Sequence, residues 1–296
     1  MMPLLLPLLP LIAQVGPFST VPGASRSTPV EQGVARKPRW TVESDTVAGA
    51  PQASSSRGKE CQAQVDDDAD EAADQAREWL ASGSATPTER AEANLCLGLA
   101  QSRLGDWSEA EAAFLAGRDA AGANRMLRAR LGAMAGNAAL AAGANDRALA
   151  ALDGARADAA GVADAGLSAG IAIDRARALV ALKRPDEADP ALAEARTAAP
   201  DNAEAWLLSA TLSRRQGRLA EAQERILRAA ELLPVDPAIG LEAGVIAMLS
   251  GHEDAARKSW QSVVTAAPES TEAETAKGYL AQLGPAAAAS AGPTKP

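Results

Sequence analysis

A pattern of small and large residues returns every 34 residues along most of the chain, and this period limits the possible fold more than any other feature. In the segment 203–236, Ala210 stands at the eighth position and Ala222 at the twentieth. A unit of this length has room for two short helices and a turn, but it cannot bury its apolar side alone. The sequence therefore predicts a stack of helix pairs whose surface carries the function.

Five segments carry the pattern in one phase. In the first, Gly98 and Ala110 are small where two antiparallel helices would approach closely, and Phe114 is large beside that contact. Gly105 is expected to end the first helix in a left-handed conformation, and Asp106 to accept hydrogen bonds from the free amides of the second. The five segments are 91–124, 129–162, 169–202 (with Lys183 in place of the turn glycine), 203–236 and 237–270.

This pattern resembles the tetratricopeptide repeat family, whose signature is an aromatic residue, Leu-Gly, Tyr, Ala, Phe, Ala and Pro over 34 residues. The resemblance covers residues 91–270, although Gln101, Ser213 and Ala247 replace the signature tyrosine. It implies an all-α, right-handed solenoid of about five helix pairs. It also implies a concave groove, lined by the first helix of each pair, that binds a peptide or protein segment instead of catalysing a reaction.

The composition agrees with an all-α fold. Hydrophobic residues make up 47% of the chain and aromatic residues only 3%, so the apolar surface is mostly alanine and leucine. Valine and isoleucine are scattered and never alternate over a useful length, which argues against strands. We therefore divide the chain into a signal-like apolar segment and the start of a linker (1–24), a disordered linker (25–59), an N-terminal capping helix (60–90), the solenoid (91–284, ending in a cap helix over 271–283) and a disordered tail (285–296).

The first thirteen residues, MMPLLLPLLPLIA, are apolar and too short to cross a bilayer. They resemble a secretion signal cleaved after Ala13, but no Lys or Arg precedes the apolar run, as the usual signal requires. Export would place the chain in the periplasm or outside the cell, in the envelope of a bacterium. The alternative is a cytoplasmic protein with a disordered apolar N-terminus.

The expected oxidation state of the two cysteines depends on whether the chain is exported. Cys61 stands just before a helix expected from Asp66 to Ser82, whose Trp79 packs inward, and Cys96 lies on the first helix of the first repeat. In an exported chain, an even cysteine count without metal-ligand spacing suggests a disulfide that staples the cap to the solenoid. In a cytosolic chain the same residues would be two reduced, partly buried thiols, and a mixed-disulfide redox role is a third possibility.

Residue types that are typical of catalytic sites are scarce in this sequence. His252 is the only histidine and falls at a turn after Gly251, so no metal site is expected unless carboxylates supply the other ligands. Gly166 to Gly170 matches the nucleophile elbow around Ser168, but that motif needs a strand before the serine and a helix after it. We predict no enzyme activity, no cofactor, no metal and no small-molecule substrate.

The distribution of charge favours a protein partner. A net charge of −9 makes nucleic-acid binding improbable, and no segment has the length of a membrane span. In the resembled family, set positions of each first helix face the groove, and transferring them gives Arg103, Arg130, Asn137, Arg177, Leu207, Arg214, Arg215, Val245 and Met248. Guanidinium groups suit carboxylates, so an acidic or C-terminal partner segment is expected to dock there. The alternative is that the aliphatic parts of these arginines lie on packed helices while their guanidinium groups stay in water.

The predicted function is a scaffold or adaptor in the cell envelope, with a cytosolic scaffold or regulatory subunit as the alternative.

Overall fold

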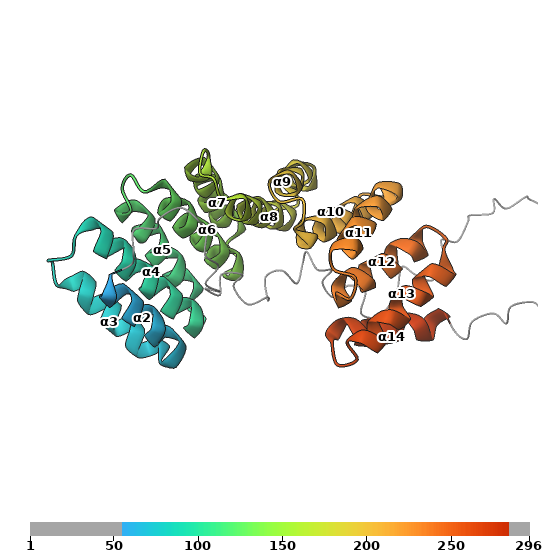
Figure 1. The fold of residues 1–296 in the computed structure, drawn as a ribbon, viewed down its shortest axis with the longest axis horizontal. Helices are drawn as coiled ribbons and strands as arrows, with labels where there is room; N and C mark the ends of the chain where they lie inside the picture. The colour runs from blue at the N-terminus through green and yellow to red at the C-terminus, as the bar shows by residue number, and fades with distance from the viewer. Residues whose placement is uncertain (1–54, 284–296) are drawn as a thin grey trace, which may run out of the picture.

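The computed structural model describes residues 55–283, which form thirteen α-helices and no strand. Figure 1 shows these helices following one another along an arch, with α2 and α3 at one end and α14 at the other. The prediction of an all-α solenoid is confirmed. The helices are α2 (Ser56–Asp67), α3 (Ala69–Ala81), α4 (Pro87–Leu104), α5 (Trp107–Ala120), α6 (Arg125–Ala141), α7 (Asn145–Ala159), α8 (Ala165–Ala181), α9 (Pro185–Ala198), α10 (Ala203–Arg215), α11 (Leu219–Leu232), α12 (Pro237–Leu249), α13 (Glu253–Ala266) and α14 (Thr271–Leu283).

Each repeat segment is one helix pair, and its eighth and twenty-fourth residues make the closest contact within the pair. Gly136 on α6 lies against Leu152 on α7, so a Cβ at Gly136 would come within 2.4 Å of the leucine Cγ. Gly244 on α12 has the same relation to Trp260 on α13, with a Cβ 2.2 Å from the indole nitrogen. The small residue lets the two backbones approach, and the large one fills the space beside them.

The turn within each pair has a left-handed residue, which satisfies the last carbonyl groups of the first helix. Gly105 adopts φ = 87° at the end of α4. Lys183 takes the same conformation with φ = 60°, at a cost that glycine avoids, because the surrounding repeat imposes it. The predicted cap at Asp106 is wrong, because its side chain accepts no hydrogen bond from the amides that open α5.

The N-terminal region differs from the single helix expected over Asp66 to Ser82. The structure has two helices, α2 and α3, and α2 begins within the segment expected to be a linker. The break falls at Asp68, which has an extended backbone and whose carboxylate accepts a hydrogen bond from the Glu71 amide at 3.0 Å. A short polar side chain is more stable as an N-cap than inside a helix, and therefore the run of aspartates ends one helix and starts the next.

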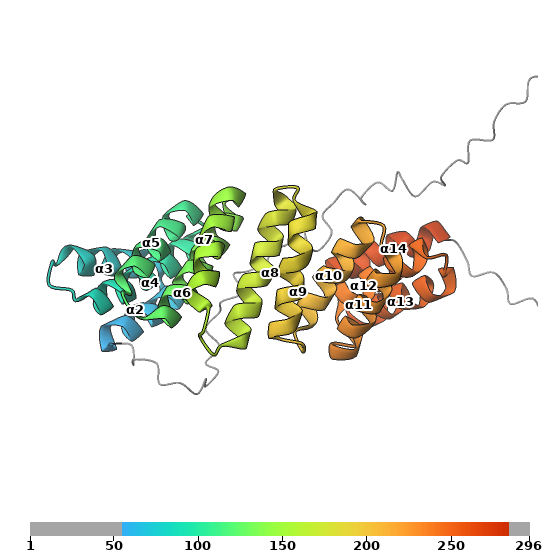
Figure 2. The same ribbon diagram turned by 90° about the horizontal axis from the view of Figure 1, so that it is seen from above.

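The first helix of each pair lies on the inner side of the arch. Within residues 55–283, the closest contacts between alternate helices join first helices to one another or to a terminal helix: α2 to α4, α6 to α8, α10 to α12 and α12 to α14. Elements on the inside of a curve approach one another most closely, and Figure 1 shows α6 and α8 beneath α7 and α9. Seen from above in Figure 2, the helices cross the long axis, so the pairs stack one behind the other. We call this inner side the concave face.

The core crosses the boundaries between helix pairs. One cluster of fully buried residues runs from Ala139 on α6 through Ile173 on α8 to Leu212 on α10. Alanine supplies much of it, as the composition predicts for short helices in close contact. Among the described helices, none is both long enough and apolar enough to span a bilayer.

Candidate functional site

Polar side chains on the concave face pair across the boundaries between repeats. We call the following set the inner ladder: Arg130 with Asp164, Asn137 with Asp174, Arg177 with Asp174 and Glu204, and Arg214 with Glu242. Apart from the pair of Arg177 with Asp174 on α8, each contact joins the first helix of one repeat to the first helix of the next, or to the residue that caps it. The ladder therefore fixes how neighbouring repeats sit against one another.

The centre of the inner ladder is buried. The Asp174 side chain is 0% exposed and accepts a hydrogen bond from Asn137 Nδ2 at 2.8 Å. Arg177 bonds to Asp174 on one side and to Glu204 on the other. Burial lowers the pKa of Arg177, but the charges of Asp174 and Glu204 outweigh that effect and hold its pKa above the ordinary value. The carboxylates thus compensate a guanidinium group that has little contact with water.

Three of the arginines predicted to line the groove are paired within the chain. Arg214 Nε lies 2.6 Å from Glu242 Oε1, and the Glu242 side chain is only 4% exposed. Arg130, Arg177 and Arg214 all have a carboxylate partner within the chain, so a partner's acidic segment would have to displace it. Arg103 is exposed and makes no hydrogen bond or ion pair with any residue of 55–283, and Arg215 is exposed at the end of α10.

One predicted apolar anchor is not on the surface. Leu207 is 4% exposed and packs in a core cluster with Ile226 of α11 and Ile239 of α12. The neighbouring helix pair covers the position that the family pattern assigns to the groove. Leu207 therefore stabilises the junction between α10, α11 and α12 and does not face a partner.

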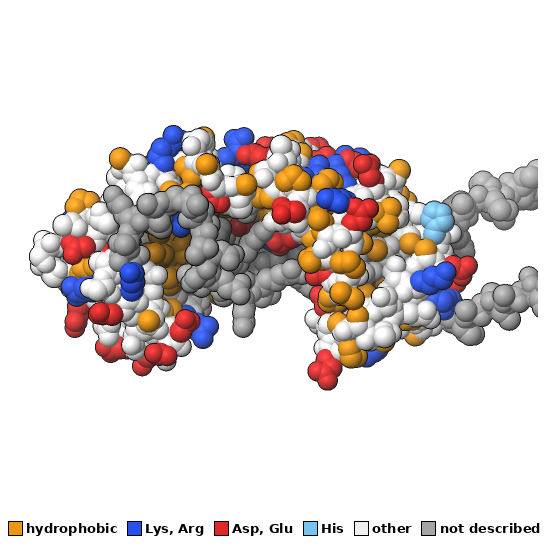
Figure 3. All heavy atoms as spheres, viewed as in Figure 1, with side chains coloured by type: hydrophobic (Ala, Val, Ile, Leu, Met, Phe, Trp, Pro, Cys, Tyr) orange, Lys and Arg blue, Asp and Glu red, His pale blue; other side chains and the backbone are white. Residues whose placement is uncertain are grey.

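The apolar part of the concave face lies at its C-terminal end. Val245 and Met248 are half-buried on α12 beside Tyr279 of α14. Leu249 is 51% exposed and follows Glu242 by seven residues, so it lies on the same side of α12 as the inner ladder. Figure 3 shows hydrophobic side chains gathered over the arm that α10–α14 form. Leu249 is not among the predicted groove residues, although it occupies the same repeat position as Arg215.

A second set of ion pairs involves aspartates of the outer helices α7 and α9. Asp158 on α7 lies 2.7 Å from Arg118 of α5 and 2.9 Å from Arg128. Asp189 on α9 lies 2.9 Å from Arg218. Burial raises the pKa of each aspartate, but hydrogen bonds and charges from the arginines outweigh it, so both values lie below the ordinary one.

These two aspartates predict how stability depends on pH. Their folded-state pKa lies below the unfolded value of about 3.8, so their contribution is complete above that value and is lost as pH falls through the folded-state pKa. We expect Tm to decrease as the pH is lowered below about 4. The decrease is expected to be smaller in the double variant Asp158→Asn, Asp189→Asn. Thermal unfolding followed by circular dichroism measures both, and equal losses in the two proteins would contradict the assignment.

The structure offers a small cavity and no reactive cluster near it. The cavity lies between α8, α9 and α10 and has a volume of about 10 Å³, which is room for about one water molecule. It is lined by Ala176, Arg177, Val180, Leu192, Leu208 and Leu212. This space is too small for a metabolite or cofactor.

The candidate residues for chemistry lie in ordinary helical surroundings. Ser168 is inside α8 and donates its hydroxyl hydrogen to the Asp164 carbonyl at 3.0 Å, so the sharp turn of a nucleophile elbow is missing around it. His252 is exposed at the N-cap of α13. Among residues 55–283, no three His, Cys, Asp or Glu side chains come together as metal ligands would.

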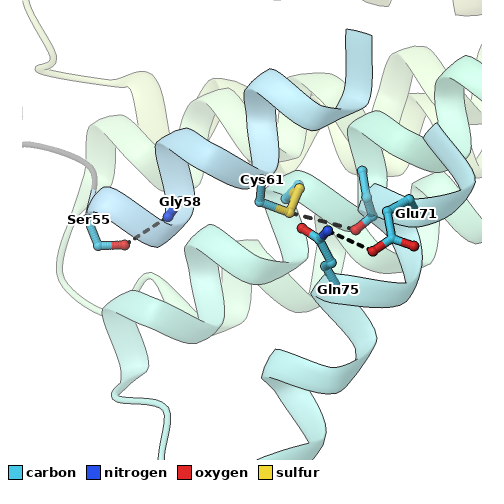
Figure 4. Close-up of a disulfide and its surroundings, with 7 residues drawn as sticks. Ser55, Gly58, Cys61, Glu71 and Gln75 are labelled. Atoms are coloured by element: carbon cyan, nitrogen blue, oxygen red, sulfur yellow. Dashed lines mark hydrogen bonds between the residues drawn. A yellow bond between two sulfur atoms is a disulfide. The ribbon is translucent and has the colours of Figure 1, made fainter. Parts of the chain in front are cut away.

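Cys61 of α2 and Cys96 of α4 form a disulfide in the structure, with their Cα atoms 6.0 Å apart (Figure 4).

Comparisons with known proteins agree with this architecture. Residues 179–244 match the model of the tetratricopeptide repeat family. PilF of Pseudomonas aeruginosa superposes with a TM-score of 0.57 at 13% identity, covering 75% of this chain and 99% of that one. A MamA protein of Desulfovibrio magneticus RS-1 gives 0.52 at 16% identity, covering 62% and 98%.

A thermophilic tetratricopeptide repeat protein of Thermus thermophilus gives a TM-score of 0.50 at 19% identity, covering 65% of this chain and 99% of that one. No curated protein matches the chain in sequence. At these identities the solved structures show the fold alone. The model match thus identifies residues 179–244 as tetratricopeptide repeats, and the superpositions show that the described helices share the fold of tetratricopeptide repeat proteins.

Proposed function

We propose that this chain is a non-enzymatic scaffold that binds a protein or peptide segment on its concave face. The support is architectural, because the described residues form a stack of helix pairs with an inner surface. Repeat stacks of this kind present extended concave surfaces to partners. Function in such a fold depends on surface chemistry, which here differs between the two ends of the arch.

The exposed leucine on α12 carries the proposal. Leu249 lies beside the half-buried Val245 and Met248, and together they offer a partner apolar surface that is now partly in water. Arg177 and Arg214 are already neutralised by Asp174, Glu204 and Glu242, so they contribute less to recognition than the sequence suggests. A partner segment with apolar anchors therefore fits this end of the groove better than a purely acidic one.

The location of the protein is part of the proposal. We infer that the chain is exported, with removal of the apolar run up to Ala13, and that it works in an oxidising compartment of the cell envelope. The segments 1–54 and 284–296 lie outside the described residues, so the support is the sequence together with the cysteine pair on α2 and α4. Mass spectrometry of the native protein tests this inference. A chain starting near Gln14 with joined cysteines supports export, and an intact Met1 with free thiols would favour the cytosolic scaffold.

A pair of matched leucine variants tests the binding surface. Leu249 on the concave face is 51% exposed, and Leu227 on the second helix α11 is 54% exposed. Once a partner has been captured, titration by calorimetry is expected to show at least about a tenfold weaker Kd for Leu249→Asp, because a charge would be buried against apolar anchors. Leu227→Asp is expected to change Kd by less than about twofold.

The two variants also separate folding from binding. Both leucines are half in water, so either substitution is expected to leave Tm within a few degrees of the wild-type value. Equal weakening by both variants, or weakening by Leu227→Asp alone, would place the partner on another surface.

A further inference from the structure

Helix α2 lies against both α3 and α4 but buries few apolar side chains there. It has twelve residues, and only Gly58, Cys61 and Val65 are buried. Gly58 has no side chain to bury, so Cys61 and Val65 supply nearly all the apolar contact. A helix of this length is marginal in water by itself and depends on packing for its stability.

The specific contacts of α2 outside these residues are polar and lie at its first turn, and Gln62 and Gln64 are half-buried farther along the helix. The Ser55 amide donates to Glu92 Oε1 at 3.0 Å, and the Ser55 hydroxyl also bonds to Glu92. The Arg57 guanidinium lies 4.8 Å from the centre of the Trp79 ring. Hydrogen bonds and cation–π contacts that are partly in water contribute about 1 kcal/mol or less each. The bond between Cys61 and Cys96 is therefore the principal attachment of the middle of the helix.

Helix α2 covers an apolar surface that belongs to the rest of the fold. Cys61 and Val65 pack on Ala72, Ala76 and Ala100 of α3 and α4. Because α2 occupies the place of a first helix beside α4, it also forms the N-terminal end of the concave face. Departure of α2 would uncover this surface and shorten the groove by one helix.

The neighbouring helix α3 has a second attachment to α4 that does not involve Cys61 or Val65. Trp79 of α3 is 2% exposed and packs with Ala85 and Ala93 in a separate cluster. Asp68 caps α3 through its own side chain and is the only residue between α2 and α3. A change in φ and ψ at this one residue is sufficient for α2 to swing away while α3 stays in place.

We propose that the Cys61–Cys96 disulfide is a redox latch for α2. In the oxidised chain the bond holds α2 against α4. A dithiol reductant breaks it by supplying two electrons and two protons, which leaves a thiol on each cysteine and a disulfide on the reductant. The reduced chain then has α2 undocked and the rest of the solenoid folded. The chain has only two cysteines, so no other pairing competes.

Hydrogen exchange of the full-length protein, followed by mass spectrometry, tests the latch. After treatment with dithiothreitol, amides of 56–67 are expected to exchange at least about tenfold faster, while α4–α13 change by less than about twofold. The double variant Cys61→Ala, Cys96→Ala is expected to show the same fast exchange in α2 without any reductant, so the result does not depend on access to the buried bond.

A matched control separates the effect of the disulfide on α2 protection from the effect of apolar packing. Val65→Ala removes the other apolar contact but keeps the disulfide, and its oxidised form is expected to retain most of the α2 protection. Unchanged protection of α2 in the double cysteine variant would overturn the proposal. Loss of protection in all helices together would also overturn it, because the disulfide would then stabilise the whole fold and not one helix.

Discussion

Replacement of Asp174 by alanine is expected to lower the free energy of unfolding by about 2–4 kcal/mol, because it removes one of the two carboxylates that compensate the buried Arg177 guanidinium and the acceptor of the Asn137 amide. Asp174 is 0% exposed, bonds to Arg177 of its own helix and accepts a hydrogen bond from Asn137 of α6. Its removal breaks the inner ladder at the centre of the arch. Urea unfolding followed by circular dichroism measures the loss.

An exposed ion pair provides the control for Asp174. Asp74 pairs with Arg77 at 2.8 Å, but its side chain is 72% exposed. Asp74→Ala is expected to change stability by less than about 0.5 kcal/mol, since water screens such a pair. Similar losses in the two variants would show that the burial of the inner ladder has no energetic consequence.

Substitution of Gly136 by alanine is expected to cost about 1–3 kcal/mol, although alanine is the better helix former. The added Cβ would lie 2.4 Å from the Cγ of Leu152, and Leu152 is fully buried with no room to move away. Helices α6 and α7 must separate to accept it. Thermal unfolding of the variant, compared with that of the wild-type protein, gives the change in stability.

The matched substitution at Gly278 is expected to have the opposite sign. Gly278 is also inside a helix, α14, but a Cβ there would meet no atom within 4 Å. Gly278→Ala is expected to stabilise the protein by roughly 0.5–1 kcal/mol through helix propensity alone. Stabilisation by both alanines would mean that the close contact of α6 with α7 is not required.

The helix pairs could be predicted from the sequence because the pattern encodes a direct contact. Gly98 faces Phe114, and Gly244 faces Trp260, sixteen residues later in each repeat. A small residue and a large one at this spacing are the two sides of one interface, so their recurrence specifies both the helices and their packing. The all-α solenoid follows from the phase alone.

The pairing of charges on the concave face could not be predicted in the same way. Asn137 reaches Asp174 over 37 residues, whereas Arg214 reaches Glu242 over 28. The family pattern gives the face on which a side chain lies but not its partner in the next repeat. Leu207 shows the same limit, since it occupies a groove position by pattern and is covered by α12 in the structure.

The end of the fold near Cys61 was harder to predict because it departs from the repeat. Helix α2 has few apolar residues and no repeat phase, so its start at Ser56 carries little signal. The break at Asp68 depends on a competition between helix continuation and capping. Among three successive aspartates, propensity alone does not select which one ends the helix.

Site-specific photocrosslinking in the native cell tests the central claim most directly. A photoreactive amino acid placed at Leu249 on the concave face is compared with the same amino acid at Leu227 on the outer helix α11, since the two side chains are almost equally exposed. A discrete protein adduct is expected from position 249 and none from position 227. Adducts from position 227 alone, or the same adducts from both, would contradict a scaffold that binds its partner on the concave face.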